Sequence, residues 1–163
     1  MKKIFLSFLF FLISIPVFSF QFNSYQWGES YDDIRMKIRS DSKSIMAIDD
    51  DRVLKYADRI LDEDCVVTLE FSPISKELAL IKIIWADKGI AEDMKKILVE
   101  KYGEYKKSNI FIEEYRWQSA GEFDVIVLEY DYAGTTLTYY GGDSYRKYRD
   151  EFDKFYESEK DIF

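Results

Sequence analysis

The sequence predicts an α+β fold in which helices pack against an antiparallel sheet. Apolar and polar residues alternate in several segments, most regularly in 65–71, and this pattern is typical of strands with one buried face. Three other segments carry apolar residues at helical spacing. Short acidic or glycine-containing turns separate the strands, and such turns join neighbouring strands in antiparallel order. These observations favour helices layered on an antiparallel sheet.

Residues 1–19 differ in composition from the rest of the chain. Two lysines precede an apolar run at 4–17, and Val17 and Ser19 fit the small-residue positions before a cleavage site. We therefore predict a secretory signal peptide at 1–19, followed by a single α+β domain at 20–163. The apolar run is shorter than the ~20 residues that a membrane span needs, so retention of the segment as an anchor is the less favoured alternative.

Composition narrows the partners and the chemistry. The 163-residue chain has a formal net charge of −8, which repels phosphate backbones and anionic membranes, so we expect no nucleic-acid partner. Cys65 is the only cysteine, so no disulfide can form within the chain. The predicted signal peptide places the protein in the periplasm or outside the cell, with no stable membrane span after cleavage.

The first half of the domain is predicted to contain one helix followed by strands. Ser30 is placed to cap a helix at 31–39, with Asp33 three residues later, and Ile34 and Ile38 share one face of this helix. The segment at 77–85 is apolar on both faces, which is typical of a central strand. The predicted strands are 52–61, 65–71 and 77–85, with 44–48 as a candidate short strand.

The second half repeats this order. A helix begins near Ile90 and is closed by Tyr102 and Gly103, where the glycine permits a positive φ. The segment 104–109 is interpreted as a charged linker. A last helix begins at Asp143 or Ser144. The predicted strands here are 110–118, 123–132 and 135–140, and the apolar stripe of the last helix comprises Tyr145, Tyr148, Phe152 and Phe155.

The predicted architecture is therefore two units, 27–86 and 87–163, each with one helix and three strands. Helices lie on one face of the antiparallel sheet, and a C-terminal helix completes the domain. Several packing residues carry a resemblance to known proteins: Trp27 and Gly28 before the first helix, the aromatic strand that ends in Phe71, Lys101, Tyr102 and Gly103 at the end of the second helix, and Trp117 before a hairpin.

With these residues the chain resembles a family of uncharacterised exported bacterial proteins. Its layout is also similar to the two-repeat fold of the β-lactamase-inhibitor protein and of small outer-membrane-assembly lipoproteins. The chain lacks the lipid-bearing cysteine of those lipoproteins. The shared motifs consist of turn and packing residues, so the resemblance implies a fold, carries over no catalytic residue and implies little about function.

Several chemistries lack the residues they need. The absence of histidine excludes Ser-His-Asp and Cys-His catalysis and histidine-bound zinc. Cys65 begins an alternating strand and has no basic neighbour in the sequence, so we interpret it as a small buried side chain and not as a nucleophile. The acidic clusters at 49–51 and 62–64 lack the ligand spacing of calcium loops and are interpreted as solvated turns. We therefore predict no catalytic residue, no cofactor and no metal site.

The strand at 135–140 carries the candidate binding face. Alternation places Thr136, Thr138 and Tyr140 on the side opposite Leu137 and Tyr139. If that side is exposed, it forms a Tyr/Thr surface that can stack on a sugar or contact a protein. The alternative, favoured by the aromatic last helix, is that this helix covers it.

The predicted function is a non-catalytic protein-binding module of the cell envelope, and not an enzyme. Two alternatives remain open. The first is a proteinaceous enzyme inhibitor of the β-lactamase-inhibitor-protein type, which the layout implies by resemblance alone. The second is a hydrolase that uses only carboxylates, which would need two acidic side chains facing each other in a pocket.

Overall fold

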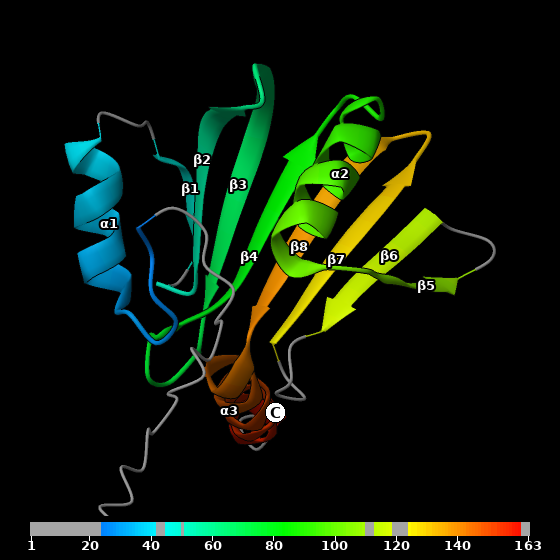
Figure 1. The fold of residues 1–163 in the computed structure, drawn as a ribbon. Coiled ribbons are helices and arrows are strands. Elements are labelled where there is room, and N and C mark those ends of the chain that lie inside the picture. Colours follow the sequence, from blue (N-terminus) through cyan, green and yellow to red (C-terminus); the bar gives the residue numbers. More distant parts are fainter. Residues whose placement is uncertain (1–23, 42–44, 50, 110–112, 119–123, 161–163) are drawn as a thin grey trace, which may run out of the picture.

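The computed structural model describes residues 24–41, 45–49, 51–109, 113–118 and 124–160. Within these residues an eight-stranded antiparallel sheet carries three helices, so the predicted α+β class is confirmed (Figure 1). The predicted signal peptide at 1–19 lies outside the described residues. The elements are α1 (Tyr31–Ser40), β1 (Ile45–Asp49), β2 (Val53–Ile60), β3 (Glu63–Phe71), β4 (Leu78–Trp85), α2 (Ile90–Tyr102), β5 (Lys106–Asn109), β6 (Glu113–Gln118), β7 (Asp124–Asp131), β8 (Gly134–Gly141) and α3 (Gly142–Lys160).

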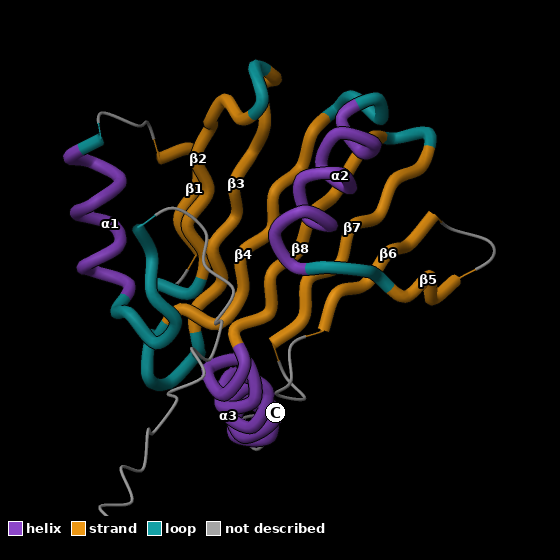
Figure 2. Tube along the Cα trace, viewed as in Figure 1, coloured by secondary structure: helices purple, strands orange, loops and turns teal. Residues whose placement is uncertain are grey.

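Two meanders form the sheet and meet at its centre. The strand order is β1-β2-β3-β4-β8-β7-β6-β5, so the last strand of each meander pairs with the last strand of the other (Figure 2). In this central pair, β4 and β8 align in antiparallel register from Leu80 opposite Tyr140 to Trp85 opposite Thr135. The apolar segment that the sequence predicts as a central strand is β4, and it lies between β3 and β8.

Each unit contains four strands rather than the predicted three. β1 is the candidate short strand of the first unit, and it pairs with β2. β5 occupies the segment interpreted as a charged linker, and it pairs with β6 at the other edge of the sheet. The apolar pattern missed β5 because an edge strand that exposes Lys106 and Lys107 has no apolar face to reveal it. β7 ends at Asp131, and Tyr132 is 97% exposed in the following turn rather than on the predicted strand.

The helices lie on both faces of the sheet rather than on one. α1 and α2 cover the same face, where Ile34 and Ile38 of α1 and Met94 and Leu98 of α2 join one buried cluster (Figure 1). α3 contacts the opposite face, because Tyr145 packs against Tyr140 and Tyr148 donates a hydrogen bond to Glu70. Both partners point away from the buried cluster, which contains their neighbours in sequence, Tyr139, Leu69 and Phe71.

Local interactions explain where the first two helices begin and end. The Ser30 hydroxyl accepts a hydrogen bond of 3.2 Å from the Asp33 N–H, as the sequence predicts for an N-cap. Gly103 ends α2 with φ of +83° and ψ of −161°. The positive φ agrees with the prediction, but ψ is extended, so the residue is not in the left-handed helical region. None of the described helices is both long enough and apolar enough to span a membrane.

Candidate functional site

The face opposite α1 and α2 is covered only in part, and its uncovered part is the candidate functional site. Three rows of side chains cross this face at right angles to the strands, in the register set by the pairing of β2 to β8. The row nearest α3 contains Glu70 and Tyr140, which contact α3. The row farthest from these contacts, which we call the open row, comprises Ala57, Val66, Ile84, Thr136, Glu129 and Glu114.

The open row crosses six strands, in the order β2, β3, β4, β8, β7 and β6, and changes character along its length. Ala57 is exposed, Ile84 is 40% exposed, and Val66 and Thr136 are half-buried, so its first part is an accessible apolar strip. Its other end is acidic, because Glu129 of β7 lies directly opposite Glu114 of β6. Like charges placed opposite each other destabilise a sheet. Arg116 of the neighbouring row forms an ion pair of 3.5 Å with Glu114 and offsets part of that repulsion, and a positively charged partner would offset more of it.

The three residues of the predicted binding face lie on this side of β8 and are covered to different extents. The Tyr140 ring packs edge-to-face on Tyr145 at 4.7 Å, and burial raises the pKa of its phenol. Thr138 is only 5% exposed. Thr136 belongs to the open row and is half-buried. Within the predicted binding face, α3 therefore covers Tyr140 at one end, and Thr136 at the other end remains accessible. Sequence reasoning did not identify Ile84 as a surface residue.

A pocket of about 160 Å³ lies where α3 meets the sheet. The Tyr148 hydroxyl donates a hydrogen bond of 3.1 Å to Glu70, and burial raises the pKa of this phenol to about 12. The pocket contains one carboxylate, so its lining does not supply the carboxylate pair that a glycosidase-type hydrolysis uses. The lining residues are Arg52, Val53, Glu70, Phe71, Pro73, Tyr148 and Phe152.

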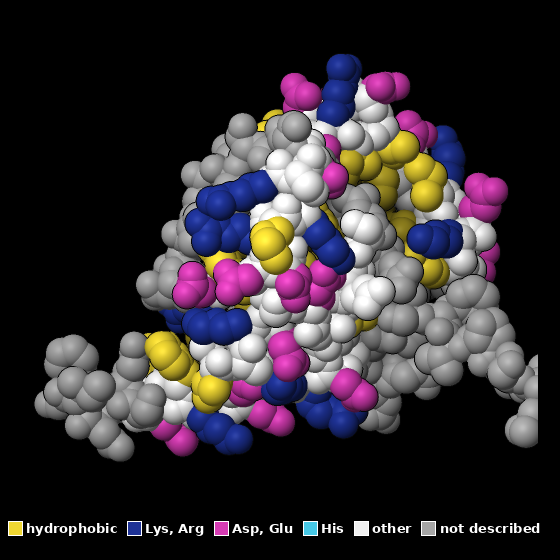
Figure 3. Space-filling model, turned by 90° about the vertical axis from the view of Figure 1, so that its left-hand side faces the viewer, with side chains coloured by type: hydrophobic (Ala, Val, Ile, Leu, Met, Phe, Trp, Pro, Cys, Tyr) yellow, Lys and Arg dark blue, Asp and Glu magenta, His cyan; other side chains and the backbone are white. Residues whose placement is uncertain are grey.

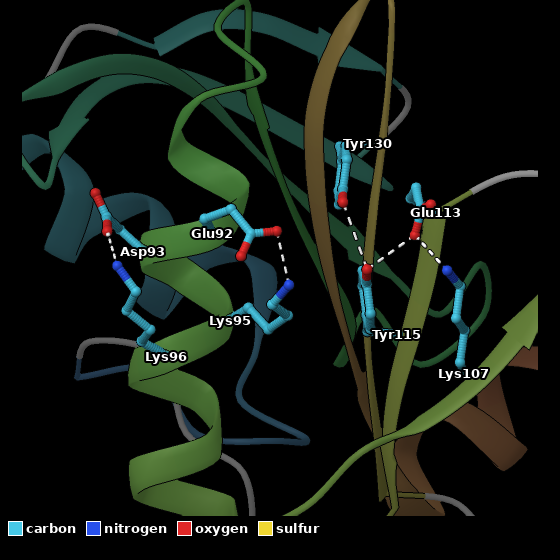
Figure 4. Close-up of polar contacts among 8 residues, drawn as sticks. All are labelled: Glu92, Asp93, Lys95, Lys96, Lys107, Glu113, Tyr115 and Tyr130. Carbon is cyan, nitrogen blue, oxygen red and sulfur yellow. Dashed lines mark hydrogen bonds and ion pairs between the residues drawn. The ribbon is translucent and has the colours of Figure 1, made fainter.

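A second polar cluster lies between α2 and the β5–β7 edge (Figure 4). Tyr115 donates a hydrogen bond of 2.8 Å to Glu113, and its hydroxyl lies 3.4 Å from that of Tyr130. Lys107 forms an ion pair with Glu113, and the ammonium groups of Lys107 and Lys95 lie 5.7 Å and 4.7 Å from the centre of the Tyr115 ring.

These contacts make Tyr115 a structural donor rather than a nucleophile. The hydrogen bond with Tyr130, burial and the bond to Glu113 all raise the pKa of the Tyr115 phenol. The hydrogen bonds from Lys107 and Tyr115 lower the pKa of Glu113. Tyr115 therefore stays protonated at ordinary pH. The sequence did not predict the cluster, because it assigned the segment containing Lys107 to a linker.

The other side chains with chemical potential occupy ordinary positions. Cys65 is buried at 5% exposure, and its thiol lies 3.5 Å from the Asp58 carbonyl oxygen. In the part of the chain that the structure describes, no three cysteine or acidic side chains come together to hold a metal ion. The side of the molecule around α1 carries mixed positive and negative side chains with small apolar patches between them (Figure 3).

Comparisons of this chain with protein-family models, with curated proteins and with solved structures found no match.

Proposed function

We propose that this chain is an exported, non-catalytic binding protein that presents the open row of its sheet to another protein. The observation that supports this proposal is the apolar strip from Ala57 to Thr136, which crosses the central strands β4 and β8 without a helix over it. The face of an antiparallel sheet that lies in water usually carries polar side chains, so accessible apolar side chains in the middle of that face are suited to protein contact.

The charges around the open row indicate the chemistry of the partner. Its acidic end, at Glu129 and Glu114, favours a partner with lysine or arginine side chains beside an apolar surface. The net charge of −8 disfavours nucleic acid. Glu70 is the single carboxylate that lines the pocket, so the pocket favours a binding protein over a hydrolase that uses only carboxylates.

A photo-crosslinking amino acid at position 84 tests the proposal in cells of the native host. We expect it to capture a protein that the same crosslinker at Met36, which is 62% exposed on α1, does not capture. The purified partner should then lose at least about tenfold in affinity with Ile84→Asp and retain its affinity with Met36→Asp. Identical capture at both positions, or equal affinity of both variants, would contradict a role for the open row.

The element order favours one alternative function. Each half of the chain runs helix and then four strands, and the halves join edge to edge at β4 and β8. This two-unit order is similar to the layout that led us to expect an inhibitor of the β-lactamase-inhibitor-protein type. Inhibition assays against a panel of secreted hydrolases test it. Inhibition of one enzyme that is abolished by Ile84→Asp would make that enzyme the partner of the open row.

A further inference from the structure

We propose that a second copy of this chain docks on the C-terminal half of α3, so that two α3 helices pack antiparallel about a two-fold axis near Phe152. The apolar side of this half is accessible, because Phe152 is 39% exposed and Tyr156 is 56% exposed. Beside it, the N–H of Ile74 donates to Glu151, and the Ile74 side chain is 58% exposed. These residues differ from those of the open row.

The aromatic side chains of α3 form a continuous ladder. Tyr145, Tyr148, Phe152 and Tyr156 stack in order, with ring centroids 5.8, 5.9 and 6.2 Å apart and interplanar angles of 13 to 28°. The four rings therefore form one continuous aromatic side of the helix. Aromatic side chains of another helix can pack on such a side in offset or T-shaped contacts.

The charges of α3 are arranged in the reverse of the order that a helix prefers. Residues 142–149 carry three cations and one acid, whereas residues 150–157 carry four acids and one cation. The helix dipole favours acids at the N-terminus and cations at the C-terminus, so this order weakens the isolated helix. An antiparallel second copy corrects it, because the basic half of each helix then faces the acidic half of the other.

The alignment about Phe152 brings particular charges together. It places Arg149 of one copy opposite residues 153–157 of the other copy. This segment includes Asp153 and Glu157. None of these three side chains forms an ion pair with another described residue, and all three are exposed. A two-fold interface uses every such contact twice, so the complementarity is repeated.

The same alignment places Tyr156 of one copy opposite Tyr148 of the other, beside the pocket. That pocket measures about 160 Å³ and is lined in part by Val53, Pro73 and Phe152. A cavity of roughly 150 Å³ accommodates a benzene ring, so the pocket is large enough for the ring of Tyr156 from the second copy. Tyr156 would thus act as the anchor of the interface.

Sedimentation equilibrium of the chain from residue 20 onward, which contains every described residue, tests the proposal. We expect a concentration-dependent dimer, and Tyr156→Ala should raise its dissociation constant about tenfold or more. Tyr132→Ala is the matched control, because Tyr132 is 97% exposed in the β7–β8 turn and should leave the dimer unchanged. A chain that stays monomeric at all soluble concentrations, or a Tyr156→Ala variant that dimerises like the wild type, would overturn the proposal.

A charge exchange tests the antiparallel alignment. Arg149→Glu should weaken the dimer, because it places acids opposite Asp153 and Glu157. Adding Glu157→Arg to this variant should restore the dimer, which a loss of folding could not do. Failure of the double variant to recover would exclude this alignment of the two helices.

Discussion

Gly103 ends α2 with φ of +83° and ψ of −161°, a combination that is almost restricted to glycine. A Cβ at this position would meet no atom within 4 Å, so only backbone strain opposes a side chain. We expect Gly103→Ala to reduce the free energy of unfolding by about 1–3 kcal/mol, measured by urea titration. Gly103→Asn should cost as much, because asparagine tolerates left-handed helical ψ rather than this extended value. Unchanged stability in Gly103→Ala would contradict this account.

Two buried tryptophans offer a matched comparison at the same scale. The indole N–H of Trp117 donates a hydrogen bond of 2.9 Å to the Gly103 carbonyl oxygen, whereas the buried indole N–H of Trp85 has no hydrogen-bond partner among the residues that the structure describes. Both side chains are at most 1% exposed. We expect Trp117→Phe to destabilise the protein by about 1 kcal/mol more than Trp85→Phe, because only the first loses a hydrogen bond. Equal changes in the denaturation midpoint would show that this bond contributes little.

At the scale of elements, Glu151 attaches α3 to the turn between β3 and β4. Its carboxylate accepts hydrogen bonds from the N–H groups of Ile74 and Ser75 at 3.0 and 2.9 Å. Burial of Glu151 opposes its charged form, but these bonds outweigh the burial and lower the pKa of the carboxyl group. We expect Glu151→Gln to destabilise the protein by about 1.5–3 kcal/mol at pH 7, since bonds to charged groups have this magnitude.

The pH dependence of that change follows from the direction of the pKa shift. Because the pKa is lower in the folded state than the value of 4.5 for a free side chain, the stabilisation is complete above pH 4.5. It disappears as the pH falls through the folded-state pKa. Thermal melts of the wild type and Glu151→Gln should therefore converge below pH 4.5. A difference that stays constant down to pH 3 would assign the effect to packing instead.

The elements also show what the sequence could and could not predict. β4 was predictable because seven of its eight residues are apolar, and a strand with apolar side chains on both sides has few other places in a fold. β5 was not, because hydrogen bonding to β6 makes it a strand while its lysines remain in water. The stripe on α3 was visible at helical spacing, but spacing alone does not tell which face of the sheet a helix will cover.

At the scale of the whole molecule, the sequence predicts which residues share one side of a strand but not which of them a helix covers. Alternation along β8 assigns Thr136, Thr138 and Tyr140 to one side, since the period of a strand is two residues. How far α3 extends over that side depends on contacts far apart in the sequence, such as Tyr148 with Glu70. Ile84 is accessible only because α3 does not reach its row, and no local pattern around residue 84 carries that information.

The order of the strands also has a consequence for synthesis of the protein. β4 is the most apolar strand described, and one of its two neighbours, β8, is the last strand to leave the ribosome. Until residues 134–141 are made, the first meander exposes the hydrogen-bonding edge of β4 to any other unpaired strand, including that of another nascent chain. The growing chain therefore passes through its most aggregation-prone stage late. We therefore expect the time between synthesis of β4 and synthesis of β8 to affect the yield of soluble protein, because pairing with β8 covers that edge.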